Sequence, residues 1–433
     1  MKFALLGLDD DTKALCRSIL ASDDHSLVAC CSDDDEMTSA ETVAAELTDE
    51  GPSRSILLKQ LQELDLASLS TAADAVIVSR TTHAGVEQAG PRFEQTRFLA
   101  RQRAPLIVSQ PINISTLDYY ELEMLSSDSG GTMLPLVASH TTDQIDYLIA
   151  GTRPGGEHAQ ASPDFGTIEQ IVMHRYLTDR SRHSVMENFA RDAILLSRLC
   201  GEVKSVAAMG PEVVATKFTN LNVQMSGADG RLVHWSIEPA TDACRAQLTV
   251  VGSRRTLTLD ISDYEQRDRW RFSEPTGEMG DFAQQRRERP LADVVAIELR
   301  DTESPKQTLP TWRDATRGIE LAEAAITSLK KGRTIKLRAE GRGEEEAFKG
   351  TMAALGCGIL IGTTALLFGL SVVMFVARSS NIGWLNNLAE FVVYWPYALL
   401  GILVAFLLIQ LLRFLIPAGN SSDYPSRTRQ END

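Results

Sequence analysis

Short, mostly apolar runs open the chain and alternate with amphipathic stretches. These runs occupy residues 1–7, 27–31, 75–78 and 105–108. Continuous apolar strands separated by helical segments are typical of a parallel sheet that helices cover on both faces. With one further strand at 134–137, the pattern predicts a doubly wound, Rossmann-type first domain over residues 1–140.

From residue 141 the pattern changes to strands in which apolar and polar residues alternate. These strands are expected at 166–174, 203–209, 217–225, 232–237, 246–251 and 256–261. Such alternation predicts a mainly antiparallel sheet with one solvated face. Helices are expected at 186–199 and 313–330, and the charged residues 265–289 are expected to form a loop. The pattern therefore predicts a second α/β domain with an open sheet over residues 141–338.

Two long segments that lack charged residues follow a short charged linker at 339–350. The first covers residues 351–377, and the second is uncharged over 391–412. Each exceeds the roughly 20 residues that cross a bilayer core of about 30 Å. The sequence therefore predicts a hairpin of two transmembrane helices, 351–377 and 391–416, with the lipid bilayer as a partner. A buried hairpin in a soluble core is the alternative, and the length of both runs disfavours it.

Positive residues flank both outer ends of this predicted hairpin, whereas the connection between its helices carries only Arg378. The positive-inside rule then places the soluble region and both termini on the cytoplasmic side of the cytoplasmic (inner) membrane. The polar tail, residues 418–433, is expected to be disordered.

The formal net charge of -15 lies entirely in the first 350 residues, because four Arg and four acidic residues cancel beyond them. An acidic soluble region argues against nucleic acid as a partner, although simple solubility explains the charge as well. None of the six cysteines forms a C-x-x-C pair or has a histidine at ligand spacing. We therefore expect free thiols in a reducing compartment and no metal site.

Several local patterns follow one another along the first 338 residues. They are a strand–turn–helix at 7–12, a strand at 74–79 followed by His83, the sequence Leu-Ile-Val-Ser-Gln-Pro at 106–111, a helix before the Gly-Glu-Val-Lys-Ser-Val of 201–206, and a closing helix, glycine and strand at 323–337. This order resembles the Gfo/Idh/MocA family of sugar oxidoreductases. The resemblance implies an α/β fold with a Rossmann domain and a second, open-sheet domain, NAD or NADP as cofactor, and a sugar or polyol as substrate.

The resemblance also implies a cofactor cleft. Its residues would be Gly7, Asp9, Thr12, Asp33, Ser79, His83 and Pro111. The family has G-x-G-x-x-G where this chain has Gly7, Asp9 and Thr12, so Asp9 either opposes a phosphate or simply caps the helix. Asp33 stands where an acid holds the adenosine ribose, and a solvated acidic loop is the alternative. His83 either lines the cleft or begins a helix.

The first proton-transfer position that the resemblance implies is Gln110. The family's strand ends in Glu-Lys-Pro, where this chain has Ser109, Gln110 and Pro111. The family's lysine polarises the reacting hydroxyl. Glutamine can donate a hydrogen bond, but it has no cation to stabilise an alkoxide.

The other two implied catalytic positions are Glu187 and Arg191, where the family has Asp-x-x-x-His on one helix face. Arginine cannot act as a base near neutral pH. A register slip would bring Asp192 or His183 into play instead. An ordinary i, i+4 ion pair between Glu187 and Arg191 is the simpler expectation.

Two functions remain open at this point. One is an NAD(P)-dependent oxidoreductase that acts on a sugar or polyol. The other is a non-catalytic descendant that serves as a membrane-bound sensor or scaffold. In either case the resemblance implies a homo-oligomer formed through the second domain's sheet.

Overall fold

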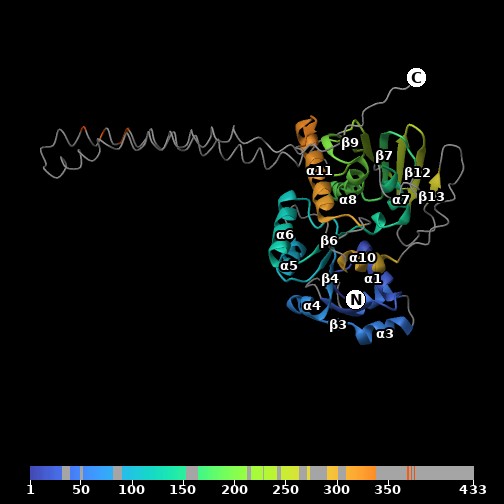
Figure 1. Cartoon of the computed structure of the whole chain (residues 1–433), viewed down its shortest axis with the longest axis vertical. Coiled ribbons are helices and arrows are strands. Elements are labelled where there is room, and N and C mark those ends of the chain that lie inside the picture. Colours follow the sequence, from blue (N-terminus) through green and yellow to red (C-terminus); the bar gives the residue numbers. More distant parts are fainter. Residues whose placement is uncertain are drawn as a thin grey trace, which may run out of the picture. The chain divides into compact units, whose positions relative to one another are not determined.

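The computed structural model divides the chain into two compact units, Met1–Ala339 and Glu340–Asp433. It describes residues 1–31, 40–48, 52–80, 90–152, 164–211, 216–227, 229–240, 245–262, 271–273, 290–300, 309–337, 368, 369, 372 and 375. Almost everything described therefore belongs to the first unit. Figure 1 shows its two layers, with β7, β9 and β12 in one and β3 and β4 in the other.

The first layer is a six-stranded sheet with the order β3-β2-β1-β4-β5-β6. The strands are β1 (Lys2–Leu6), β2 (Ser26–Cys31), β3 (Gln62–Glu63), β4 (Ala75–Val78), β5 (Leu106–Ser109) and β6 (Met133–Leu136). Every neighbouring pair is parallel. Strand order reverses between β1 and β4, so the carboxyl ends of these strands form the topological switch point. The predicted Rossmann-type sheet is confirmed.

Helices cover both faces of this sheet. They are α1 (Asp10–Leu20), α2 (Ala40–Leu47), α3 (Pro52–Gln60), α4 (Leu66–Ala72), α5 (Pro91–Ala100), α6 (Thr116–Ser129) and α7 (Asp143–Thr152), with the 3₁₀ turn η1 (Ala138–His140) after β6. Phe3 and Leu5 enter one hydrophobic core, whereas Ala4 and Leu6 enter the other. Cys30 and Cys31 separate in the same way, as their adjacency on a strand predicts.

The helix α10 (Leu291–Arg300) is a feature that the sequence pattern did not predict. It packs against α1, and Leu291 and Val295 join the core that contains Leu5 and Leu15. Residues 291–300 thus complete the first layer although they lie within the predicted second domain. Their apolar face is short, and it follows a charged stretch that hides its periodicity.

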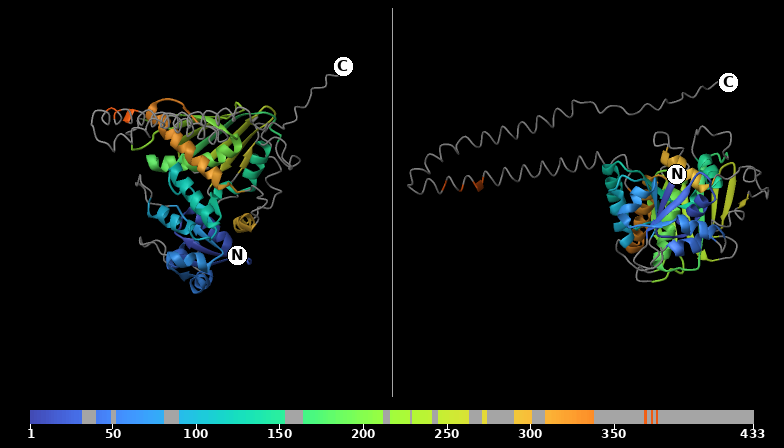
Figure 2. Two further views of the ribbon diagram at one scale, coloured as in Figure 1. Left: turned by 60° about the vertical axis from the view of Figure 1, so that its left-hand side comes forward. Right: turned by 90° about the horizontal axis from the view of Figure 1, so that it is seen from below.

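The second layer is an eight-stranded sheet with the order β13-β12-β11-β7-β10-β9-β8-β14. The strands are β7 (Ile168–Leu177), β8 (Val203–Met209), β9 (Asn222–Gly227), β10 (Leu232–Pro239), β11 (Ala246–Gly252), β12 (Thr256–Ile261), β13 (Arg271–Ser273) and β14 (Ile335–Lys336). Only the β7–β10 pair among them is parallel, so the predicted mainly antiparallel sheet is confirmed. Figure 2 shows this green and yellow sheet apart from the blue N-terminal layer.

The strand predicted at 217–225 begins later, at Asn222, for a local reason. Lys217 instead forms an isolated bridge with Ser181, and the Phe218 N–H donates to the Arg180 carbonyl at 2.8 Å. Residues 217–218 therefore support the turn at residues 180–181, which precedes the helix that begins at Arg182. Only the later part of the predicted strand belongs to the sheet.

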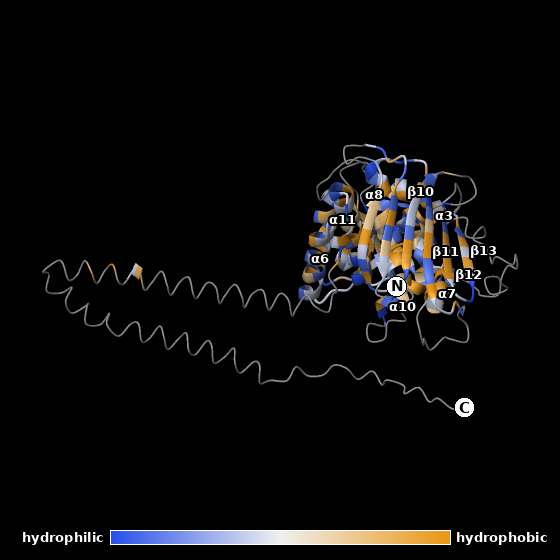
Figure 3. Cartoon of the chain, turned by 90° about the horizontal axis from the view of Figure 1, so that it is seen from above, coloured by the Kyte–Doolittle hydropathy of each residue, from blue (hydrophilic) through white to orange (hydrophobic). Residues whose placement is uncertain are grey.

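Two long helices cover one face of the second sheet, α8 (Arg182–Cys200) and α11 (Trp312–Lys331). They approach closely at Gly318, where an added Cβ would overlap Ile194 and crowd the Ala190 carbonyl. The opposite face has no such cover within the described residues. Figure 3 shows hydrophilic and hydrophobic residues alternating along β11 and β12, as expected for a sheet with one polar face.

No helix among the described residues is long and apolar enough to cross a membrane. The predicted span at 391–416 lies outside the described residues, as do all but four residues of 351–377. The linker at 339–350 and the tail at 418–433 also lie outside them.

Candidate functional site

The turn between β1 and α1 keeps the geometry of a dinucleotide-binding loop at its first residue only. Gly7 has φ of 72°, and a Cβ there would overlap Ser79 and Arg92. This position therefore requires glycine. Asp9, at the family's second glycine position, instead begins α1 as its N-cap residue.

Asp9 and Thr12 form a reciprocal cap at the start of α1. The Thr12 N–H donates to Asp9 Oδ1 at 2.9 Å, and the Asp9 N–H donates to Thr12 Oγ1 at 2.8 Å. The other carboxylate oxygen, Oδ2, accepts the Arg80 N–H at 2.7 Å. The capping alternative for Asp9 is thus confirmed. Its negative charge lies at a helix N-terminus, which is where such a loop would otherwise receive a phosphate.

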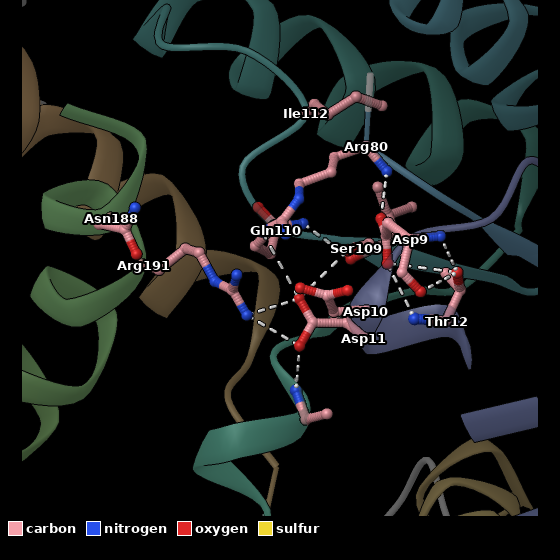
Figure 4. Close-up of polar contacts among 12 residues, drawn as sticks. Asp9, Asp10, Asp11, Thr12, Arg80, Ser109, Gln110, Ile112, Asn188 and Arg191 are labelled. Carbon is pink, nitrogen blue, oxygen red and sulfur yellow. Dashed lines mark hydrogen bonds and ion pairs between the residues drawn. The ribbon is translucent and has the colours of Figure 1, made fainter. Parts of the chain in front are cut away.

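Asp11 is the centre of the polar cluster that Figure 4 shows. Its two carboxylate oxygens accept from Arg191 Nη2 at 2.8 and 2.6 Å, and Oδ1 also accepts the Ala138 N–H at 3.0 Å. Arg80 Nη1 lies 3.8 Å from Oδ2, and the Ser109 hydroxyl lies 3.4 Å from it. Segments from β1–α1, β4, β5, η1 and α8 therefore meet at one carboxylate.

The electrostatics of this cluster reflect its burial. Burial raises the pKa of the Asp11 carboxyl, while Arg191 and Arg80 act in the opposite direction. Burial lowers the pKa of Arg191, but the ordinary value is so high that the guanidinium keeps its charge near neutral pH. For Arg80, burial lowers the pKa, and the carboxylates of Asp9 and Asp11 outweigh that effect and raise it.

Gln110 is fully buried at the end of β5. Its Oε1 accepts from the Tyr119 hydroxyl at 2.5 Å, and its Nε2 donates to the Val108 carbonyl at 3.0 Å. Tyr119 in turn accepts the Ile112 N–H at 3.1 Å and stacks on Trp312 with ring centroids 5.2 Å apart. Both ends of the Gln110 amide therefore have partners within the protein, and the side chain supports the fold rather than a ligand.

Glu187 and Arg191 do not pair with each other, so the ion pair expected from their spacing is wrong. Glu187 Oε1 lies 3.2 Å from His183 Nε2, one turn earlier on α8. The hydrogen bond that His183 donates to the Glu187 carboxylate raises the pKa of His183 above its ordinary value. Arg191 instead reaches Asp11, 180 residues away in the chain. Arg191 pairs with Asp11 and not with Glu187 because Asp11 is more deeply buried, which strengthens the charge interaction.

Asp192, the next residue of α8, has a separate set of partners. It is fully buried and accepts from Arg175 Nε at 2.9 Å, from Arg175 Nη2, and from Trp235 Nε1 at 2.8 Å. Trp235 packs edge-on against Phe189, with centroids 4.9 Å apart. Asp192 therefore joins α8 to β7 and β10 inside the second layer and does not face the cluster around Asp11.

His140 is a residue of this region that the sequence did not single out. It ends η1, two residues after Ala138, and is 2% exposed. Its Nδ1 has no hydrogen-bond partner among the described residues. Burial, followed by the charges of Arg191, Arg198 and Arg175, holds its pKa well below the ordinary value, so the imidazole is neutral. Its place shortly after the end of β6 was the only available signal.

The remaining predicted site residues divide into two groups. Ser79 and Pro111 are buried, with Ser79 beside Gly7. Asp33 and His83 lie outside the described residues. The structure thus brings together Asp9, Thr12 and Arg191 around Asp11 and Arg80, and it gives Glu187 and Gln110 other partners. Among the described residues of this cluster, no side chain is an exposed and unpaired proton acceptor that lies beside a positively charged group.

No family model matches the chain, and no curated protein matches it. Its structural neighbours are dehydrogenases of the Gfo/Idh/MocA type, and those named here align with this chain over nearly their whole length. One is the WlbA dehydrogenase of Bordetella pertussis in complex with NADH and UDP-GlcNAcA, with a TM-score of 0.56, 16% identity, and coverage of 78% of this chain and 99% of the other.

Two further structures give the same alignment. The aldose-aldose oxidoreductase of Caulobacter crescentus, complexed with glycerol, has a TM-score of 0.57 and 14% identity, covering 78% of this chain and 99% of the other. A myo-inositol dehydrogenase of Corynebacterium glutamicum has a TM-score of 0.55 and 14% identity, with the same coverage. At these identities the likeness establishes the fold, and the chemistry must be argued from this chain's own residues.

Proposed function

We propose that this chain is a membrane-anchored member of the dehydrogenase fold that has lost hydride transfer and acts as a dinucleotide-responsive sensor or scaffold. The observation that carries the proposal is the state of the two proton-transfer positions. Gln110 is buried and hydrogen-bonded at both ends of its amide, and Arg191 is ion-paired with Asp11. Neither can take a proton from a substrate hydroxyl at neutral pH.

NAD or NADP is the ligand class that this proposal assigns to the first layer. Support comes from the solved structures of the same fold, of which two WlbA dehydrogenases contain NADH and an Agrobacterium radiobacter oxidoreductase contains NAD+. The required glycine, Gly7, and the start of α1 at the switch point also support it. With Asp9 and Asp11 placed as they are, however, the residues do not fit a diphosphate at this helix terminus without rearrangement.

The membrane anchor rests on the two charge-free segments and on the positive residues that flank them. In this proposal the soluble unit and both termini face the cytoplasm from the inner membrane. Flotation of the full chain with neutral lipid vesicles after an alkaline wash tests it. Recovery of the protein from the wash, free of vesicles, would contradict the anchor.

The polar face of the second sheet supports a homo-oligomer in this proposal, since no helix covers that face within the described residues. A sugar or polyol remains the class of small molecule for the cleft, as in the neighbours that contain UDP-GlcNAcA or glycerol.

An active oxidoreductase is the second candidate, because the fold match covers essentially the whole of each enzyme. A turnover assay separates the two. The full chain is incubated with NAD+ or NADP+ and a panel of sugars, polyols and cyclitols, and formation of the reduced nicotinamide is followed. The proposal expects none above a buffer control. Steady turnover that Arg191→Ala abolishes would establish the enzyme instead.

A further inference from the structure

Three large apolar side chains lie exposed along one side of α6. They are Leu117, Tyr120 and Met124, with exposed fractions of 80%, 49% and 57%. Their spacing of three and four residues places them on one face of the helix, away from the buried Tyr119 and Leu122. Isolated exposed apolar residues are ordinary, whereas a group on one helix face indicates a surface that another molecule covers. We call these three residues the α6 patch.

The helix α6 is held firmly against α11. The Thr116 N–H and hydroxyl donate to the two carboxylate oxygens of Glu323 at 3.1 and 2.8 Å. One turn later, the Tyr120 hydroxyl donates to Glu320 Oε1 at 2.8 Å. Both helices lie at one edge of the first unit (Figure 3). Because α6 belongs to the first layer and α11 to the second, whatever holds the α6 patch also holds both layers.

The chain leaves the first unit close to this pair of helices. Leu337 is the last described residue of the unit, and its N–H donates to the Lys204 carbonyl at 2.8 Å. The preceding carbonyl, that of Val203, accepts from Arg317 Nη2 at 2.6 Å. Arg317 Nη1 donates to Glu320 Oε2 at 2.6 Å, and this is the glutamate that also binds the α6 patch. A short series of direct contacts therefore joins the chain exit to the patch.

The segment predicted to enter a bilayer begins only a short distance along the chain from this exit. Residues 338–350 separate Leu337 from the charge-free run that starts at Thr351. Even when fully extended, a linker of this length spans at most about 45 Å. A tether this short keeps the first unit at a high effective concentration near the lipid surface. A small apolar patch then suffices for contact, although without the tether its small area would bind lipid only weakly.

We propose that the α6 patch contacts the interface of a zwitterionic bilayer and thereby sets the orientation of the first unit relative to the membrane. Leu117 and Met124 enter the boundary between headgroups and acyl chains. Tyr120 stays at the headgroup level, where an aromatic ring with a polar end is favoured, and it keeps its bond to Glu320. This inference rests on the proposed membrane anchor and extends it from a tether to an oriented contact.

The charges beside the patch favour a zwitterionic lipid surface over other partners. Glu121 is ion-paired with Arg97 of α5, with Oε1 2.6 Å from Nε. Glu123 and Asp128 are exposed on the same helix, so anionic headgroups would repel them. A second copy of this chain that bound the patch about a twofold axis would bring the same acidic side chains together, which is also unfavourable.

The experiment places an environment-sensitive fluorophore on the full chain in phosphatidylcholine nanodiscs. Leu117→Cys and Met124→Cys carry the label in a Cys357→Ser background, in which the cysteines of the described residues are all buried. Ile56→Cys is the control, because Ile56 is an apolar residue of α3 that is 56% exposed. Nitroxide lipids should lower the emission at positions 117 and 124 by about twofold or more, since an interfacial side chain lies within about 5–10 Å of the acyl boundary. The label at position 56 should keep its emission.

A second comparison tests whether the apolar character of the patch produces the contact. In the Leu117→Cys variant, Met124→Asp should reduce the quenching by nitroxide lipids about twofold, because a carboxylate opposes entry into the interface. Met124→Leu keeps the apolar surface and should leave the quenching unchanged. Both substitutions are at an exposed position, and circular dichroism confirms that each variant is folded.

The outcomes separate the contact from the anchor. Protein that purifies with the nanodiscs but shows no quenching at positions 117 and 124 would overturn the contact and leave the anchor in place. Equal quenching at positions 56, 117 and 124 would overturn it as well, because no face would be preferred. Blue-shifted emission at position 117 without quenching would mean that protein, not lipid, covers the patch. Failure of the full chain to enter nanodiscs would overturn the contact and the anchor together.

Discussion

Two neighbouring residues of α8 illustrate how differently one helix can use buried charge. Asp192 faces the second sheet and holds Arg175 and Trp235, all within one layer. Arg191, the preceding residue, reaches Asp11 in the first turn of α1, in the other layer. Both pairs exclude most solvent: the exposed side-chain fraction of the Arg partner is 13% for Arg175 and 16% for Arg191.

The two ion pairs differ in the role that their surroundings indicate. The Asp192 cluster satisfies a tryptophan N–H and an arginine inside a hydrophobic core, which is a structural role. The Asp11–Arg191 pair joins the first turn of α1, at the switch point of the first sheet, to α8 of the second layer. Burial makes its ionised carboxylate unfavourable, as the raised pKa of Asp11 indicates. The first pair should therefore stabilise the fold more than the second, which joins the two layers.

The largest expected effect is on stability at Asp192. Asp192→Ala removes the only carboxylate that Arg175 and Trp235 share among the described contacts. Breaking a buried ion pair by removing one partner costs about 3–5 kcal/mol. Urea denaturation of the full chain should show a loss of that size. A loss below about 1 kcal/mol would mean that water or a neighbouring group replaces the carboxylate.

The next effect concerns the position of the family's lysine. Gln110→Lys would bury an ammonium group where the amide now binds Tyr119 and Val108. We expect a loss of about 2–4 kcal/mol in unfolding free energy and no gain of turnover, because an unpaired buried charge is costly. Gln110→Met, similar in volume and uncharged, is the control and should lose less. A stable Gln110→Lys variant that reduces NAD+ with a polyol would break this interpretation.

We expect Asp11→Asn to lower the free energy of unfolding by less than the two substitutions above. This result would sharpen the contrast between the Asp11–Arg191 and Asp192–Arg175 pairs. Part of the favourable energy of the Asp11–Arg191 ion pair only offsets the cost of burying the Asp11 carboxylate, and this burial raises the pKa of Asp11. Replacement by a neutral isostere should therefore cost about 2 kcal/mol or less, by the usual range for a buried hydrogen bond. Urea denaturation beside Asp192→Asn measures the difference. A larger loss at Asp11 than at Asp192 would reverse the roles assigned here.

The smallest effect is a pH dependence from His183. Its pKa is raised in the folded protein by Glu187. The stabilisation is therefore complete below the unfolded value of about 6.5 and is lost as pH rises through the folded value. The pair is partly exposed, so about 0.3–0.5 kcal/mol is at stake. Thermal unfolding of His183→Gln should match the unaltered chain at pH 8 and fall below it at pH 5.5. A constant difference at both pH values would exclude the ion pair as its source.

Much of the fold could be predicted from periodicity. The strands β8 and β12 have the predicted bounds, and α11 differs by one residue at each end. An uninterrupted apolar run indicates a strand that is buried on both faces, and strict alternation indicates a strand that is buried on one face. Both patterns can be recognised from neighbouring residues alone. The helix α10 was missed because its apolar face is short and follows a charged stretch that hides its periodicity.

The candidate site was predicted only in part, for a related reason. The helix cap at Asp9 follows from its place before α1, and that alternative was correct. The Asp11–Arg191 pair joins residues 180 positions apart, and no local pattern reports such a contact. The i, i+4 spacing of Glu187 and Arg191 suggested a pair that burial at Asp11 overrides. His140 gave no signal beyond its position at a strand end.

The most direct test of the central claim is a turnover measurement on the full chain. Reduction of NAD+ and NADP+ is followed with sugars, polyols and cyclitols, in parallel with Gln110→Ala and Arg191→Ala. If the fold has lost hydride transfer, all three proteins will show the same rate as buffer alone. Turnover by the unaltered chain that both substitutions abolish would contradict the claim and identify Gln110 and Arg191 as catalytic residues.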